Sequence, residues 1–145
     1  MSSGTSERNV GFSSVPHPSQ QDLQTIIQRG DSKMMVLWAE RIGQALARQL
    51  TTSQIRNIFG TVRQIEMMWV PRATDQQQRQ AARQLLLLKP KLAYQARRER
   101  GKGVETLNDI LAPAIDLVGE DRERFQNFVD FFEAILAYHT AAGGQ

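Results

Sequence analysis

Cysteine is absent from the 145 residues, and this absence excludes several kinds of site at once. Without a thiol, the chain has no disulfide framework, no thiolate nucleophile and no cysteine-ligated zinc or iron–sulfur centre. Histidine is nearly as scarce, because only His17 and His139 are present, and they do not have the spacing of a metal-binding pair. The sequence therefore predicts no metal site, no cofactor, no catalytic residues and no enzymatic activity.

Long apolar runs and strand patterns are missing as well. No apolar run reaches the roughly 20 residues that a membrane-spanning helix needs, and the first residues lack the apolar core of a secretory signal. We therefore expect a cytoplasmic protein that does not contact a membrane. Apolar residues recur every three or four positions, and no stretch alternates with a period of two. This pattern predicts an all-α fold, a single compact bundle of five or six helices over residues 19–142.

Residues 1–18 are rich in serine, glycine, asparagine and proline, and they contain few large apolar side chains. Such a composition cannot bury enough surface to order itself. We expect a flexible tail, and we expect its deletion to leave folding and binding largely unchanged.

Capping residues, prolines and glycines mark where the helices start and end. Thr51 and Gln54 form a capping-box pattern before an amphipathic stretch that stops at Pro71. Other expected N-caps are Asp31 or Ser32, Thr74 or Asp75, and Asp121; other expected ends are Gly30, Leu50, Gly101 and Gly119. Pro90 either kinks one helix or separates two, and the sequence leaves both open.

The net charge of +3 hides an uneven distribution along the chain. Residues 51–102 contain eleven lysines and arginines and three acids, whereas residues 103–145 contain two arginines and eight acids. A basic middle beside an acidic end indicates either two surfaces of opposite charge, or one face that binds a polyanion while the other meets a basic partner. Ordinary solvated helix faces are the alternative interpretation.

Two arginines share one helical face in the stretch after Thr51. Arg56, Gly60 and Arg63 stand at positions i, i+4 and i+7, away from the apolar stripe. A glycine in mid-helix is explained by close approach of another backbone or a nucleic-acid strand, and equally by tight helix packing.

Six cations crowd into the fourteen residues from Lys89 to Lys102, with Glu99 as the only acid. Tyr94 lies between them at helical spacing, either as a group that contacts a sugar-phosphate backbone or as a core side chain. The segment around Lys102 lacks the spacing of a nucleotide-binding loop. The candidate nucleic-acid contacts of this region are Arg79, Arg83, Lys89, Lys91, Tyr94, Arg97, Arg98, Arg100 and Lys102.

Three stretches together resemble a known family. They are LTTSQIRNIFG at residues 50–60, LLLLKPKLAYQARR at residues 85–98 and FQNFVDFFEAILAYH at residues 125–139. In this order they are similar to the small subunit of the type III-A CRISPR–Cas effector, the Csm interference complex. The resemblance covers about residues 30–142 and leaves the N-terminal tail without a counterpart.

The resemblance implies a small helical subunit without catalytic function, present in several copies along a ribonucleoprotein. Its implied partners are CRISPR RNA, target RNA, copies of itself, backbone subunits with an RNA-recognition fold, and a large polymerase-like subunit. The implied RNA contacts are Arg56, Arg63, Lys89, Lys91, Arg97 and Arg98. Stacked copies would pair the acidic end of one with the basic middle of the next, so exchanging Glu120, Asp121 and Glu123 for lysine is expected to weaken assembly.

A helical scaffold or oligomerisation module without nucleic-acid binding is the competing hypothesis. In that case Trp38, Trp69 and Phe131 serve as exposed anchors, although core positions are more usual for such side chains. Salt dependence distinguishes the two, because RNA binding through cations weakens steeply as salt rises.

Overall fold

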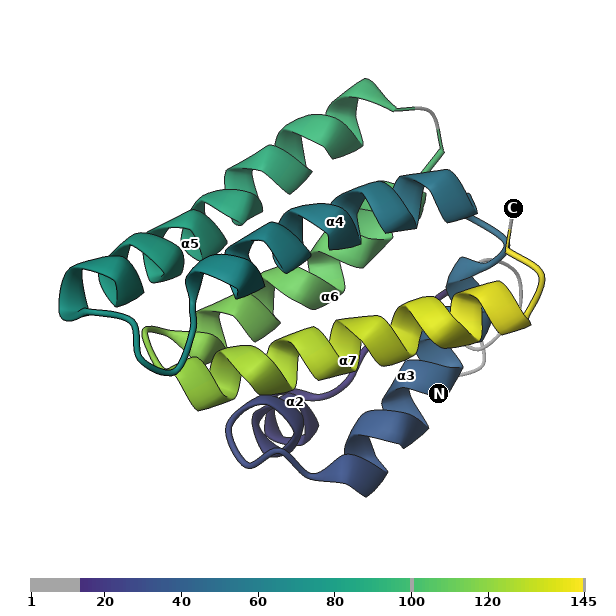
Figure 1. Ribbon diagram of the computed structural model, residues 1–145. Helices are drawn as coiled ribbons and strands as arrows, with labels where there is room; N and C mark the ends of the chain where they lie inside the picture. The colour runs from purple at the N-terminus through teal and green to yellow at the C-terminus, as the bar shows by residue number, and fades with distance from the viewer. Residues whose placement is uncertain (1–13, 100, 145) are drawn as a thin grey trace.

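The structure is a computed structural model that describes residues 14–99 and 101–144. The described residues form six α-helices and no strand, which confirms the all-α prediction. The helices are α2 (Gln20–Ile27), α3 (Ser32–Leu46), α4 (Thr52–Met68), α5 (Asp75–Arg98), α6 (Gly103–Val118) and α7 (Arg122–Ala141) (Figure 1). Figure 1 shows α7 beside both α3 and α4. Helix α5 packs against α4 and α6, on the side of these helices that is away from α7. None of the described helices is long and apolar enough to cross a membrane.

Side-chain caps start most of these helices, as expected. The Thr51 hydroxyl accepts a hydrogen bond from the backbone N–H of Gln54 at 3.1 Å, and the Gln54 side-chain oxygen accepts one from the N–H of Thr51 at 2.8 Å. Thr74 and Gln77 form a second capping box at the start of α5. These bonds satisfy N–H groups that have no partner within the helix, and they set the register of α4 and α5.

The centre of the fold is the close crossing of α3 and α7. A Cβ built at Gly43 would lie 2.7 Å from the backbone oxygen of Ile135 and 2.7 Å from the Cβ of Tyr138, so only glycine fits there. Next to the crossing, the ring of Phe132 meets Phe59 of α4 edge to face, with centroids 5.1 Å apart. The aromatic side chains of α7 therefore join α4 to the core that α3 and α7 form.

Pro90 lies within α5, which continues through it as one helix of 24 residues. The ring is on the exposed side, while Leu88 and Leu92 on either side are buried. A proline leaves one carbonyl without its helical N–H partner, and water can reach that carbonyl on an exposed face. Packing of the flanking leucines holds the helix together across the defect.

The expected tail divides at the start of the described residues. Residues 1–13 lie outside them, and Val15 is 5 % exposed and belongs to the hydrophobic core. The imidazole of His17 donates a hydrogen bond from Nδ1 to the carbonyl of Val15 at 2.8 Å. Val15 is therefore not part of a flexible tail, in contrast to the expectation for residues 1–18. The polar composition of its neighbours gave no sign that this one side chain packs into the core.

Helix α3 ends at Leu46, a turn earlier than expected. A tight turn follows, in which the N–H groups of Gln49 and Leu50 both bond to the carbonyl of Leu46 at 2.9 Å. Leu50 is buried, and its carbonyl accepts a hydrogen bond from Nε2 of the fully buried His139. This histidine therefore has a packing role at the end of α7.

Candidate nucleic-acid interface

The outer face of α4 carries the predicted pair of arginines. Ile58 and Val62 are buried on the core side, whereas Arg56, Gly60 and Arg63 are all exposed. Arg63 pairs with Glu66 one turn later, at 2.9 Å between Nη1 and Oε1. Glu66 is the only acid of this helix, so Arg56 keeps its charge without an ion-pair partner among the described residues.

Packing among the described residues does not explain Gly60. A Cβ built at this position has no heavy atom within 4 Å, and the backbone does not have a positive φ. The tight-packing alternative for Gly60 is therefore wrong. Relative to alanine, a glycine at an exposed interior helix position costs about 1 kcal/mol.

Tyr94 is an exposed side chain of α5, with 66 % of its surface accessible. The guanidinium carbon of Arg98 lies 5.7 Å from the centre of its ring, within the range of a cation–π contact. The core interpretation of Tyr94 is excluded by this exposure. An amphipathic ring held beside a cation is suited to contact with a ribose or a base.

Helix α5 presents its cations on two sides. Arg83, Lys91, Tyr94 and Arg98 follow the spacing of one outward stripe, which also contains the exposed Leu87. Arg79 and Arg97 follow a second exposed stripe. Neither stripe contains an acid, and Asp116 and Glu120 of the α6 end lie across a groove from Arg79 and Arg83.

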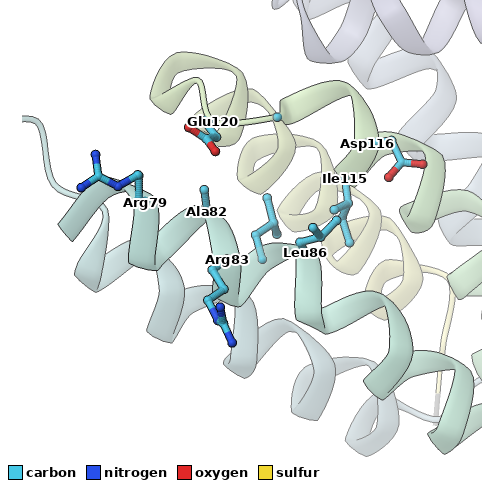
Figure 2. Close-up of a pocket in the computed structure, with 9 residues that line it drawn as sticks. Arg79, Ala82, Arg83, Leu86, Ile115, Asp116 and Glu120 are labelled. Atoms are coloured by element: carbon cyan, nitrogen blue, oxygen red, sulfur yellow. The ribbon is translucent and has the colours of Figure 1, made fainter. Parts of the chain in front are cut away.

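A groove of about 350 Å³ separates α5 from the end of α6 (Figure 2). Ala82, Leu86 and Ile115 provide apolar surface between Arg79 and Arg83 on one rim and Asp116 and Glu120 on the other. Figure 2 shows Arg79 and Arg83 reaching away from the groove, toward solvent. Acids along the far rim lower the positive potential on this side of α5.

Lys89 is committed to an ion pair. Its Nζ lies 2.6 Å from Oδ1 of Asp116 on α6, and both side chains are partly exposed. A partly exposed pair of this kind contributes at most about 1 kcal/mol to folding, so a phosphate can displace the carboxylate. Lys89 therefore joins α5 to α6 and is less available to an anion than Lys91.

The end of α5 is tied to the beginning of α4 by one acid. Glu99 accepts hydrogen bonds from the amide of Gln54 on α4 and from the amide of Gln95 at 2.8 Å. The bonds hold Arg97 and Arg98 at a set position relative to Arg56 on the neighbouring helix. Sequence reasoning noted Gln54 and Glu99 separately and missed this positioning role, because the pair joins residues 45 positions apart.

The remaining candidates lie at the turn between α5 and α6. Lys102 is exposed and precedes α6 as its N-terminal boundary residue. Arg100 lies outside the described residues. The structure thus leaves Arg56 and Arg63 exposed on α4, and Lys91, Tyr94 and Arg98 exposed on the neighbouring α5; we call these five residues together the α4–α5 face. Lys89 is held toward α6 by Asp116.

Acids gather on the other two long helices. Glu105, Asp109 and Asp116 form an outward stripe on α6, and Glu123, Asp130 and Glu133 are exposed on α7. Residues 103–141 contain eight acids and two arginines, whereas residues 52–98 contain nine lysines and arginines and two acids. The charge imbalance read along the sequence is therefore also a separation between pairs of helices.

The described residues hold no cluster of three or more metal-ligating side chains. The described residues therefore form a small helical protein with exposed cations on α4 and α5 and one exposed tyrosine, Tyr94.

The family follows from a comparison with protein-family models. The model described as Csm2 Type III-A matches residues 30–145. The chain therefore belongs to this family, the small subunit of the type III-A CRISPR Csm complex, as the resemblance indicated. A search of the curated proteins and a search of the solved structures each gave no match.

Proposed function

We propose that this chain is a non-catalytic subunit of a Csm complex that binds the backbones of CRISPR RNA and target RNA on its α4–α5 face. The observation that carries the proposal is the exposure of Arg56, Arg63, Lys91, Tyr94 and Arg98 on two neighbouring helices that have few acids. Family membership indicates the complex to which the chain belongs, and the exposed cations suggest where the chain contacts RNA.

The chemistry of the face suits phosphate recognition without base reading. Guanidinium groups bind phosphate oxygens with two parallel hydrogen bonds, and such contacts carry no sequence information. Sequence selection then remains with base pairing between the two RNAs. In this proposal the other subunits, with their RNA-recognition folds and polymerase-like domain, perform cleavage and synthesis, and the complex resides in the prokaryotic cytoplasm.

Stacking of copies is the second part of the proposal. The acidic stripe on α6 faces outward. Among the described residues, neither Glu105 nor Asp109 of this stripe has an ion-pair partner. A neighbouring copy offers cations, and a contact between unlike surfaces repeats along an open helical array. RNA and carboxylates compete for the same cations, so we assign the α5 stripe of Lys91, Tyr94 and Arg98 to RNA and the stripe of Arg79 and Arg97 to the next copy.

The structure improves the choice of variants for the stacking test. The carboxylate of Asp121 caps α7 by accepting the N–H of Arg124 at 3.0 Å, so its exchange for lysine would also damage the fold. Glu105→Lys with Asp109→Lys avoids this cap. We expect this double variant to fold normally and to lose self-association in sedimentation velocity. Unchanged association would contradict the stacking proposal.

The experiment that tests the whole proposal is purification of the tagged chain from its own host at moderate salt. Short RNAs with a uniform repeat-derived 5′ end, together with other Csm subunits, are the expected co-purifying species. Recovery of the chain without RNA would contradict RNA binding. Release of RNA by added salt, with a slope of about −0.7 in log K per neutralised phosphate, would identify the contact as electrostatic.

A protein scaffold remains the second candidate, and one surface favours it. Met67 is 77 % exposed and, with Met68 and Val70, borders a cleft of about 390 Å³ at the end of α4. The proposed anchors Trp69 and Phe131 are buried in the core, and Trp38 is half-buried beneath Arg41. An exposed methionine cluster is typical of a protein-binding surface. Association that persists in high salt would support the scaffold.

A further inference from the structure

Gly60 occupies the middle of α4, and nothing within the described chain requires a glycine there. Gly43 and Gly103, the other glycines within helices, are required by close packing, because a Cβ at either would collide with backbone atoms. Gly60 is exposed, has ordinary helical backbone and would leave a Cβ in open space. The described residues therefore give no packing reason for a glycine here, and a bound partner would supply one.

Arginines stand one turn before and one turn after this position. Arg56 and Arg63 are exposed on the same outward stripe, about 10 Å apart along the helix axis. Between two long cationic side chains, a residue without a side chain leaves a notch whose floor is the helix backbone. Arg56 has no ion-pair partner among the described residues, and Arg63 has only Glu66.

We propose that a sugar-phosphate backbone crosses α4 at Gly60, with its phosphates bound by Arg56 and Arg63 and its ribose resting in the notch. This inference rests on the proposed RNA-binding function and names the point of closest approach. The flanking arginines favour this occupant over an apolar protein helix, because phosphates compensate both guanidinium groups, whereas an apolar helix would bury Arg56 without a charge partner.

The substitution that tests the notch has effects of opposite sign on folding and binding. Gly60→Ala fills open space and raises helix propensity, so we expect the free protein to melt about 3 °C higher. Gly60→Leu fills the notch further. We expect its Kd for a fluorescently labelled single-stranded RNA of 30 nucleotides to rise about tenfold, the loss of one charge-assisted hydrogen bond, with a smaller rise for Gly60→Ala.

Two matched variants give the experiment its controls. Ala137→Leu places the same leucine side chain at an exposed position of α7, on a helix other than α4 and α5, and should leave the RNA Kd unchanged. The variant Arg56→Ala with Arg63→Ala removes the cations and reports on RNA binding by the α4–α5 face itself. All variants are measured as the full chain by fluorescence anisotropy, with thermal unfolding in parallel.

The possible outcomes distinguish a failure of the proposed notch from a failure of the proposed RNA-binding function. If the double arginine variant binds RNA like the wild type, the proposed function of this face fails. If that variant loses RNA while both Gly60 variants bind normally, only the notch is overturned. If the Gly60 variants keep RNA affinity but lose self-association in sedimentation velocity, the notch holds a second copy and the inference is also overturned.

Discussion

The basic pair of helices, α4 and α5, and the acidic pair, α6 and α7, obey the same local rules and present opposite charge. Each helix buries one apolar stripe, and three of the four start at a capping side chain. The outward stripes are Arg56 and Arg63 on α4 but Glu105 and Asp109 on α6. The comparison teaches that burial determines how these helices pack, while the exposed faces are free to specify a partner.

Charges of the minority sign are used inside the molecule in both pairs. In the basic pair, Glu66 bonds to Arg63 and to the amide of Gln126, and Glu99 accepts two amides. In the acidic pair, Arg122 donates from Nε to the carbonyl of Trp69 at 2.9 Å. Internal contacts therefore hold three of the minority charges, Glu66, Glu99 and Arg122, and reduce their effect on the two exposed surfaces.

We expect the largest change in stability from removing a side chain of the core on which both pairs of helices pack. Phe128 of α7 is fully buried, with its ring centre 6.3 Å from that of Phe125 and 6.4 Å from that of Phe132. We expect Phe128→Ala to lower the free energy of unfolding by about 3–5 kcal/mol, measured by urea denaturation. Glu133→Ala on the exposed side of the same helix should change it by less than about 0.5 kcal/mol. A loss below about 1 kcal/mol for Phe128→Ala would contradict the shared core.

A second variant removes the charge difference without touching the core. Exchanging Arg56, Lys91 and Arg98 for alanine should weaken binding to single-stranded RNA and reduce the slope of log K against log salt by about 2. Helical content should stay the same, because exposed cations contribute little to folding. The matched change of Glu105 and Asp109 to alanine should preserve RNA binding. Equal losses from both sets would erase the functional distinction between the two pairs.

The smallest expected effect concerns the segment before α2. Deleting residues 1–13 removes none of the described structure and should leave the free energy of unfolding unchanged. Deleting residues 1–18 also removes the buried Val15, which we expect to cost about 1.5–3 kcal/mol. Thermal unfolding of the two truncations side by side tests whether Val15 completes the core beneath both pairs of helices. Identical stability of the two truncations would mean that Val15 contributes nothing to the core and belongs to the expected tail.

Sequence alone was sufficient for the local features. The capping box at Thr51 and Gln54, the helix end at Gly119, the positive-φ turn residue Gly30 shortly after α2, and the cap at Asp121 all lie where the pattern predicts them or within three residues of it. These features depend on residues within a few positions of one another, so their physics is already present in a short stretch of chain.

Features that depend on neighbouring helices could not be predicted in this way. It is necessary to know which helices are adjacent before one can predict the pair of Lys89 with Asp116 or the pair of Gln54 with Glu99. The same is true of Pro90, because packing of Leu88 and Leu92 decides whether the helix survives its missing hydrogen bond. The side chain of Tyr94 could be assigned to the surface only once the buried face of α5 was known.

The separation of charge between the two pairs of helices gives each molecule an electric dipole. In the field of a polyanion, such a molecule turns before it makes contact, so its basic helices arrive first. Orientation of this kind acts mainly on the association rate, which falls as salt shortens the range of the field, and acts little on the dissociation rate. Assembly onto RNA would then depend on ionic strength through how quickly copies arrive in the correct orientation.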